Sequence, residues 1–312
     1  MTAYLNSFGF HVPERLVPNG ELAARVGCTP EWIESVSGIR ERRWAAPETS
    51  VADLAEAAAR DCLTRANVDA AQVGLLLLAS GSARPGFPAP AAELAHRLGL
   101  NLTPALDLPM ASAGSIFGLV LASQLAQVYG NVLVVAAEKM SAILEAHPLD
   151  QNTAILFGDG AGAALVSPRP EGHKILASAL HTDGQFRDDL AYHWTTPLTM
   201  NGLTVILQAS RKLPTVITEV LHAQGIAASA VGTFLLHQAN HNLLIRVAKA
   251  LQVPAERVYS NVARYGNTSS ASLLIAAAEW SRETASTEPI VLAGFGAGLH
   301  WGALVASHSP VP

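Results

Sequence analysis

The stretch ALDLPMASAGSIFGLVLA, residues 105–122, changes its pattern halfway along. An apolar run with one acid ends at Pro109 and Met110, small residues follow, and apolar side chains then recur at helical spacing. This order predicts a strand, a tight turn and the beginning of a helix, with Ser112 in the turn. A serine there is either a reactive nucleophile or an ordinary N-cap of the helix, and the stretch alone leaves both open.

The same alternation continues along the chain. Short apolar runs predict buried strands, and longer runs with apolar residues three and four apart predict helices. Pro214 is expected to begin a new segment inside one of these helices. The order of elements predicts an α/β protein with a mostly parallel sheet and helices on its faces. The expected strands cover 73–80, 131–138, 232–237 and 289–294, and the expected helices cover 51–66, 115–130, 203–225, 240–252 and 270–283.

Two Gly-rich segments resemble each other. FGDGAGAALV (157–166) and FGAGLHWGALV (295–305) both run from a turn into a short apolar strand, and they begin about 138 residues apart, at 157 and 295. That period is too long for a solenoid and fits two similar halves, 1–166 and 167–312. A chance likeness between two Gly-rich turns is the alternative.

Composition narrows the class of protein. Half of the 312 residues are hydrophobic and 14% are charged, which predicts a large buried core. The net charge of −5 and the absence of a long basic cluster argue against nucleic acid and anionic membrane as partners. No signal-peptide pattern opens the sequence, and the longest apolar helix, 113–129, is too short to span a bilayer. Two cysteines, Cys28 and Cys62, indicate no disulfide framework, so we expect a soluble cytoplasmic protein.

Three polar residues share one placement, where a strand or Gly turn meets a helix: Ser112, His237 and Asn267. Ligands gather at the carboxyl ends of strands in α/β sheets, so these side chains are expected to converge. Each also has a structural interpretation, as a helix cap, a hydrogen-bonded core histidine or a turn-forming asparagine.

Two other chemistries fit less well. A hydrolase elbow, G-x-S-x-G, would need glycine where Met110 stands, and the acid that should follow the serine is not obvious. His237 and His241 have the spacing of a zinc-binding pair, but Gln238 replaces the glutamate of that motif and no third ligand is near. No metal is therefore expected. Cys28 and Cys62 are interpreted as packing residues.

Six segments together resemble the 3-oxoacyl-acyl carrier protein synthase III family, in that family's order. The resemblance implies a thiolase-like fold with two similar halves, each with a five-stranded mixed sheet, and helices layered between and outside them (αβαβα). It also implies an obligate homodimer in which Phe87 reaches the partner's acyl pocket. Acyl-CoA or acyl carrier protein thioesters would be substrates, with no further cofactor. The segments are WIESVSGIRERR (32–43), GFPAPAAELAHRLG (86–99), FGDGAGAALV, LLHQANHN (235–242), YGNTSSAS (265–272) and GFGAGLHWG (294–302).

The family's catalytic set is Cys-His-Asn, and the resemblance places Ser112, His237 and Asn267 at those positions. The nucleophile would take an acyl group, and His237 Nε2 and the Asn267 amide would then stabilise the enolate left by malonyl decarboxylation. The N–H groups of Ser112 and Gly296 would form the oxyanion hole. The resemblance implies that substrate is bound by Trp32, Phe87, Phe157, Met200, Phe295 and Ala297.

Ser112 departs from the family's cysteine, because a hydroxyl needs a base where a thiol ionises more readily. It is a natural variant, a sign of acyl transfer to an O, N or S acceptor, or an engineered replacement; Ala113, where serine is usual, favours natural divergence. The binding face also departs: Val36, Gln151, Asn242 and Leu207 stand where the family commonly has Arg or Lys. Candidate substitutes for those cations are Arg40, Arg42, Arg43, Arg211, Lys212 and Arg246.

These features are compatible with three alternative functions. The first is a condensing enzyme that primes fatty acid or polyketide chains, which the His237–Asn267 pair favours. The second is an acyltransferase of the same fold in specialised metabolism, which Ser112 and the altered binding face favour. The third is a partner subunit that has lost condensation, which the missing cations favour.

Overall fold

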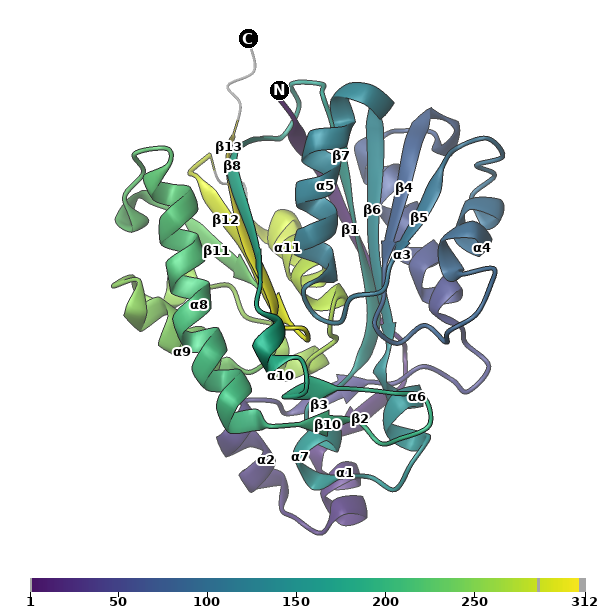
Figure 1. The fold of residues 1–312 in the computed structure, drawn as a ribbon, viewed down its shortest axis with the longest axis vertical. Coiled ribbons are helices and arrows are strands. Elements are labelled where there is room, and N and C mark those ends of the chain that lie inside the picture. The colour runs from purple at the N-terminus through teal and green to yellow at the C-terminus, as the bar shows by residue number, and fades with distance from the viewer. Residues whose placement is uncertain (1, 285–286, 309–312) are drawn as a thin grey trace.

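The computed structural model describes residues 2–284 and 287–308 of the chain. Among these residues, nine strands form one mixed sheet in the order β11-β12-β13-β8-β1-β7-β6-β4-β5 (Figure 1). The strands are β1 (Tyr4–His11), β4 (Val73–Ala79), β5 (Ala105–Leu108), β6 (Asn131–Lys139), β7 (Asp159–Ser167), β8 (His173–Thr182), β11 (Thr233–Leu236), β12 (Ile290–Gly296) and β13 (His300–His308). Two small ribbons pair β2 (Leu16–Pro18) with β3 (Glu41–Arg43) and β9 (Leu190–Ala191) with β10 (Thr199–Met200).

Helices cover both faces of this sheet. Four short 3₁₀ turns, at Ala70–Gln72, Gly184–Phe186, Ala228–Ala230 and Ala255–Arg257, complete the described elements. The α-helices are α1 (Asn19–Val26), α2 (Pro30–Ser37), α3 (Val51–Ala66), α4 (Pro90–Arg97), α5 (Gly114–Tyr129), α6 (Met140–Glu145), α7 (Gln151–Ala154), α8 (Gly202–His222), α9 (His241–Ala250), α10 (Val262–Tyr265) and α11 (Ala271–Glu283).

The sheet consists of two halves with the same pairing. In the first half β1 is antiparallel to β7, β7 is antiparallel to β6, and β6 is parallel to β4. In the second half β8, β13, β12 and β11 pair in the same order and with the same directions. The halves meet where β1 pairs with β8 at only two positions, Tyr4 with Lys174 and Leu5 with His173. The division expected after residue 166 falls at the end of β7.

The expectation of five strands in each half is wrong for the second half. The first half has a fifth strand, β5, parallel to β4, whereas its counterpart is a single bridge between Phe234 and Val258. Pro254 and the 3₁₀ turn Ala255–Arg257 come directly before Val258, and α10 begins at Val262. This leaves too few extended residues for a strand, and one further bond, from Tyr259 N–H to the Phe234 carbonyl (3.1 Å), completes the pairing.

Helices α5 and α11 lie between the two halves of the sheet (Figure 1). Helix α11 is buried on all sides from Ala271 to Trp280, and α5 is mostly buried in its first half but exposes side chains such as Val128 near its C-terminal end. The buried parts are rich in Ala, Ser and Leu rather than amphipathic. Outside them, α3 and α4 cover the first half and α8 and α9 cover the second. The layers therefore place the N-termini of both central helices in the middle of the molecule. The thiolase-like layering expected from the sequence is confirmed.

The predicted helices form with small shifts of their ends, but the break predicted at Pro214 is wrong. Helix α8 runs unbroken from Gly202 to His222 with Pro214 inside it. An interior proline costs about 3 kcal/mol, because it removes one helical hydrogen bond and crowds the preceding turn. Buried side chains on both sides of it, Leu213 and Val216 among them, pack on the sheet and offset that cost. No helix in the described ranges is long and apolar enough to cross a membrane.

Candidate active site

Ser112 lies in the turn between β5 and α5, with the backbone in the left-handed region at φ 63°. The N-cap of α5 is Ala113 and no side chain caps the helix, so the interpretation of Ser112 as an N-cap is wrong. The turn is tightly packed: a Cβ on Gly114 would lie 2.7 Å from the Cβ of Ala79, and one on Gly296 would overlap the carbonyl oxygen of Ala111. The conformation resembles a nucleophile elbow, although the glycine spacing of that motif is absent.

The polar neighbours of Ser112 come from the other half of the chain. Ser269, just before α11, also has a left-handed backbone, at φ 47°. Its Oγ accepts the Ser112 N–H at 3.0 Å and lies 3.4 Å from Ser112 Oγ. Ser270 Oγ donates to the Met110 carbonyl at 2.6 Å. The turn that carries Ser112 is therefore held by the corresponding turn of the second half.

His237 follows β11 directly and is buried. Its Nδ1 lies 2.5 Å from Ser272 Oγ, and that oxygen accepts the Gln238 N–H at 3.0 Å. Among the hydrogen bonds of the described residues, Nδ1 is the acceptor available to the hydroxyl proton of Ser272, and a proton donated to Nδ1 places the ring proton on Nε2. Burial lowers the pKa of His237 to about 4, so the ring is neutral near pH 7.

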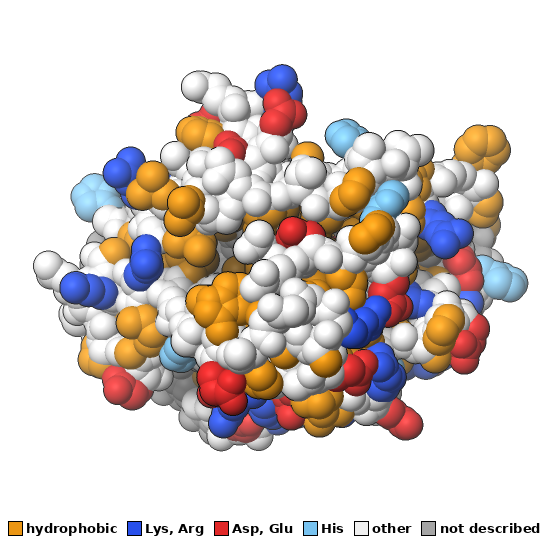
Figure 2. Space-filling model, turned by 90° about the horizontal axis from the view of Figure 1, so that it is seen from below, with side chains coloured by type: hydrophobic (Ala, Val, Ile, Leu, Met, Phe, Trp, Pro, Cys, Tyr) orange, Lys and Arg blue, Asp and Glu red, His pale blue; other side chains and the backbone are white. Residues whose placement is uncertain are grey.

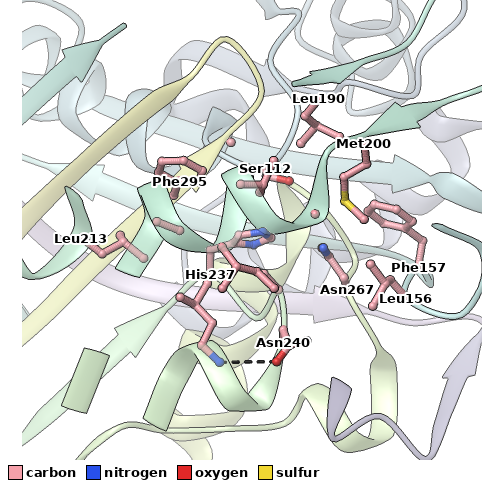
Figure 3. A pocket seen from close by; sticks show the side chains of 17 residues that line it. Ser112, Leu156, Phe157, Leu190, Met200, Leu213, His237, Asn240, Asn267 and Phe295 are labelled. Carbon is pink, nitrogen blue, oxygen red and sulfur yellow. Dashed lines mark hydrogen bonds between the residues drawn. The ribbon is translucent and has the colours of Figure 1, made fainter. Parts of the chain in front are cut away.

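Asn267 precedes α11 and lies beside Phe157 at an isolated parallel bridge. Its Oδ1 accepts the Ser269 N–H at 2.9 Å, which is the turn-forming bond typical of asparagine. The side-chain amide nitrogen is left to face the cavity, as Figure 3 shows. The turn-forming role and an orientation suited to donation therefore occur in the same residue.

Ser112, His237, Asn267 and Gly296 line one narrow cavity of about 80 Å³ (Figure 3). The rest of its lining is mostly apolar, which excludes water and strengthens hydrogen bonds made inside it. A second cavity, of about 320 Å³, also reaches Ser112 and includes Phe157 and Ala297. The predicted binding residues Phe157, Met200 and Phe295 lie on the first cavity, together with Leu156, Leu190, Val205, Ile206, Ala209 and Leu213.

Two predicted binding residues lie outside both cavities. Trp32 is half-buried on α2, where it packs beside Ile33. Phe87 is 100% exposed on the loop 80–90 and lines neither cavity of its own chain. If Phe87 acts on a site, that site belongs to another copy of the chain.

The candidate cations of the binding face differ in burial and in ion pairing. Arg42 is fully buried and hydrogen-bonded to Asn19, so it cannot bind a phosphate. Lys212 is paired with Asp183 at 3.1 Å and lies over the Trp301 ring. Arg43 is half-buried and donates to the Glu14 carbonyl. Among the six candidates, the exposed ones without an ion pair to any described residue are Arg40, Arg211 and Arg246.

The face around the site carries exposed apolar side chains. Figure 2 views the end of the molecule that lies lowest in Figure 1, and Lys and Arg lie mainly toward the edges of this face. Asn242, on α9, donates to the Ser35 and Val36 carbonyls of α2 and so fixes one helix against the other. Exposed apolar residues on α2, α8 and α9 are Val36, Leu203, Leu207 and Ile245.

Three residues of the site were missed by sequence reasoning: Ser269, Ser272 and Glu138. The first two lie in YGNTSSAS, where Asn267 was the only residue predicted to belong to the site. The serines that follow it have the pattern of an ordinary polar turn. Glu138 lies in a hydrophobic strand, and nothing in its local pattern marks it as a partner of residues 269 and 270. Their roles depend on contacts between distant segments.

The zinc-binding interpretation fails on geometry. His237 follows a strand and His241 begins α9, so the two do not share a helix face. Within residues 2–284 and 287–308, no three His, Cys, Asp or Glu side chains come close enough to hold a metal ion.

Comparison with known proteins agrees with this geometry. The family model described as 3-oxoacyl-[acyl-carrier-protein (ACP)] synthase III matches residues 106–184, and the model of its C-terminal part matches residues 221–308. A beta-ketoacyl-[acyl-carrier-protein] synthase III of Nostoc sp. is 38% identical over 318 residues, covering 95% of each chain. A relative with the same description from Gloeobacter violaceus is 39% identical and covers 97% of each chain.

Solved structures of this family have the same fold as this chain. The crystal structure of 3-oxoacyl-[acyl-carrier-protein] synthase III from Aquifex aeolicus superposes with a TM-score of 0.93 at 32% identity, covering 98% of this chain and 99% of that one. A priming beta-ketosynthase of a polyketide biosynthetic pathway superposes with a TM-score of 0.91 at 30% identity, covering 99% and 97%. The fold and site thus define an acyltransferase with a thiolase-like fold. The chain belongs to the 3-oxoacyl-acyl carrier protein synthase III family.

Proposed function

We propose that the protein takes an acyl group from a thioester onto Ser112 Oγ and joins it to a malonyl thioester with loss of CO₂, which primes a fatty acid or polyketide chain. The observation that carries this proposal is a pair of neutral donors on the cavity of Ser112: Nε2–H of His237 and the amide of Asn267. Condensation needs such donors, because decarboxylation leaves negative charge on the thioester oxygen of the enolate.

In the first half-reaction, Ser112 Oγ attacks the acyl thioester and the thiolate of the donor leaves. The tetrahedral intermediate carries an oxyanion, for which the N–H groups of Ser112 and Gly296 are the proposed donors. In the structure the Ser112 N–H donates to Ser269 Oγ at 3.0 Å. Binding of the thioester would bring the substrate oxygen to the same N–H as a second acceptor, while Ser269 keeps its position.

In the second half-reaction, a malonyl thioester loses CO₂ and its carbanion attacks the acyl group on Ser112. A neutral histidine suits this step better than an imidazolium, because the donor must stabilise the enolate without protonating it. The low pKa of His237, about 4, keeps the ring neutral throughout the physiological range. The apolar lining provides space for the acyl chain and excludes water that would hydrolyse the ester.

A homodimer is part of this proposal. Strand β5 ends the sheet and has no neighbour on its outer side among the described residues (Figure 1). Leu106 on that strand is 52% exposed, and the Ala91 N–H ties the end of the loop that carries Phe87 to Asp107 of β5 at 3.0 Å. Pairing of two β5 edges would bury Leu106 and bring Phe87 toward the partner's second cavity.

Thioesters of coenzyme A or of acyl carrier protein are proposed as donors from the family, whose name specifies the carrier protein. Arg40, Arg211 and Arg246 are the free cations that would meet the phosphates of either carrier. A second candidate, acyl transfer from Ser112 to an O, N or S acceptor, is favoured by the apolar side chains of the binding face. It needs a base for the acceptor, which the Nε2–H form of His237 does not supply.

The test supplies a panel of acyl-CoA and acyl-carrier-protein thioesters with malonyl thioesters and follows products by mass spectrometry. A 3-oxoacyl thioester with release of CO₂ supports condensation. An ester, amide or new thioester of the acyl group, without CO₂ release, supports the second candidate. No acyl adduct on Ser112 with any donor would contradict both and leave the partner-subunit interpretation.

A further inference from the structure

A chain of buried hydroxyls runs from Ser112 to a carboxylate in the middle of the protein. Ser269 Oγ donates to Glu138 Oε1 at 2.9 Å, and Glu138 at the end of β6 has no solvent exposure. A serine has one hydroxyl proton, and that of Ser269 is committed to Glu138. In the contact between the two serine oxygens, 3.4 Å apart, Ser112 must therefore be the donor.

Glu138 is fixed in this position by other donors. Its two oxygens also accept from Ser80 Oγ, from the N–H and Oγ of Ser82, and from the N–H groups of Gly81 and Ser270. The carboxylate cannot rotate away without breaking several of these bonds at a buried site, where each lost bond is costly. Ser269 is therefore held with its lone pairs toward Ser112.

His237 does not provide an alternative base. Its Nδ1 receives the Ser272 hydroxyl, so Nε2 carries the ring proton and faces the cavity as a donor. A serine hydroxyl at neutral pH is a weak nucleophile unless its proton has an acceptor. In the part of the chain that the structure describes, Ser269 is the side chain that Ser112 Oγ contacts by a hydrogen bond.

We propose that Ser269 accepts the proton of Ser112 during acylation, with Glu138 as its positioning residue and the final proton acceptor. This inference rests on the proposed acylation of Ser112 and explains how a hydroxyl works at a position where the family resemblance implies a thiol. Residue 269 would matter for a serine nucleophile and far less for a cysteine, because a thiol at a helix N-terminus ionises without a base.

During acylation, one proton moves from Ser112 through Ser269 to Glu138. The bond from Ser112 Oγ to the acyl carbon forms and the carbon–sulfur bond of the donor breaks. The Ser112 proton moves to Ser269 Oγ as the Ser269 proton moves to Glu138 Oε1, and the released thiolate takes a proton from water. When the acyl group leaves Ser112 in the second half-reaction, the same chain returns the proton from Glu138 to Ser112 Oγ.

The test is a double-mutant cycle between positions 112 and 269, with acylation followed by mass spectrometry of the whole enzyme in single turnover. Ser269→Ala should lower the acylation rate about 10²-fold when residue 112 is serine, the lower end of the range for general acid–base catalysis. In the Ser112→Cys enzyme the same change should lower it less than about threefold. Ser269→Gly should repeat the result, since glycine tolerates the left-handed backbone and separates loss of the hydroxyl from strain.

A matched control is Ser141→Ala. Ser141 Oγ donates to the buried carboxylate of Asp159 at 2.6 Å, so this change also removes a buried serine–carboxylate bond but touches neither Ser112 nor Ser269. It should lower the unfolding midpoint comparably and leave the acylation rate of the folded enzyme unchanged. Equal losses from Ser269→Ala in both backgrounds, or no loss with serine at 112, would overturn the role of Ser269. Complete absence of Ser112 acylation in the unmodified enzyme would instead overturn the proposed function itself.

Discussion

Ser272 Oγ lies 2.5 Å from Nδ1 of His237 and at the same time accepts the N–H of the next residue, Gln238, at 3.0 Å. This serine therefore sets which ring nitrogen of His237 carries the proton, and burial keeps the ring uncharged. The position of the ring proton decides whether His237 can act as a hydrogen-bond donor or as a base. With Nε2–H facing the cavity, His237 would donate to an enolate, as proposed for condensation; with a bare Nε2 it would accept a proton, as in a hydrolase.

The pKa of His237, about 4, predicts a pH dependence of folding stability. Between pH 4 and 6.5 the unfolded chain binds a proton at this residue and the native protein does not. The free energy of unfolding therefore rises with pH in that window, by up to roughly 3 kcal/mol from this residue. It is measured as the difference between the native sequence and His237→Gln in urea denaturation from pH 4.5 to 7.

The comparison with His237→Gln is needed because the titration of Asp159 changes the free energy of unfolding in the opposite direction. Burial raises the pKa of Asp159 to about 6, so the native protein binds an extra proton there between about pH 4 and 6 and stability falls as pH rises. This contribution is common to both proteins and cancels. Parallel curves for the native sequence and His237→Gln would show that His237 titrates normally in the folded protein.

Asn267→Asp should separate the two half-reactions. Aspartate keeps the Oδ1 bond to the Ser269 N–H and therefore the turn, but it replaces the amide donor by an acceptor. Malonyl decarboxylation should fall by a factor on the order of 10² or more, the scale of removing one oxyanion donor, while acylation of Ser112 changes little. Release of labelled CO₂ and the mass of the acyl-enzyme report the two steps separately. A similar loss of both would assign Asn267 a structural role.

Acyl adducts should map to Ser112 and not to the cysteines. Cys62 is fully buried, and burial raises the pKa of its thiol to about 12, so it is a poor nucleophile. Proteolysis after incubation with an acyl thioester should place the added mass on the peptide that contains Ser112, and Ser112→Ala should remove it. An adduct that persists in Ser112→Ala would indicate a different nucleophile.

The edge strand predicts a dimer. Sedimentation of the native protein should give twice the chain mass of 32.7 kDa at sub-micromolar concentration. Leu106→Lys places a charge on the exposed edge of β5 and should shift the protein toward monomer. Phe87→Ala should leave the dimer largely intact and widen acyl preference toward bulkier donors. A native monomer would show that each chain completes its own site.

Much of the fold was predictable because the elements are strongly marked. β6 is apolar from Val132 to Ala137, β12 has no polar residue, and α3 begins with a capping box formed by Ser50 and Asp53. The sequence failed where tertiary packing overrode a local rule, as at Pro214. It also failed where one extended residue, Val258, replaced an expected strand.

For the site, the sequence indicated which polar residues converge but not how they are bonded. Ser112, His237 and Asn267 share one cavity, as their placement predicted. The partners that define their chemistry, Ser272 and Ser269, lie in a serine-rich turn. A sequence pattern does not distinguish one serine of that turn from another. Glu138 is a carboxylate inside a hydrophobic strand, and its partners are known only once distant segments are brought together.

The contact between Ser112 and Ser269 spans 157 positions of the chain and has a consequence for folding. Contacts of such high sequence separation form late, because the entropy of closing a long loop must be overcome before they stabilise anything. A chain that has folded only its first half would hold the turn of Ser112 without its hydroxyl partner. The ability of Ser112 to be acylated should therefore arise with the last cooperative step of folding. Formation of the acyl-enzyme would then report that both halves have docked.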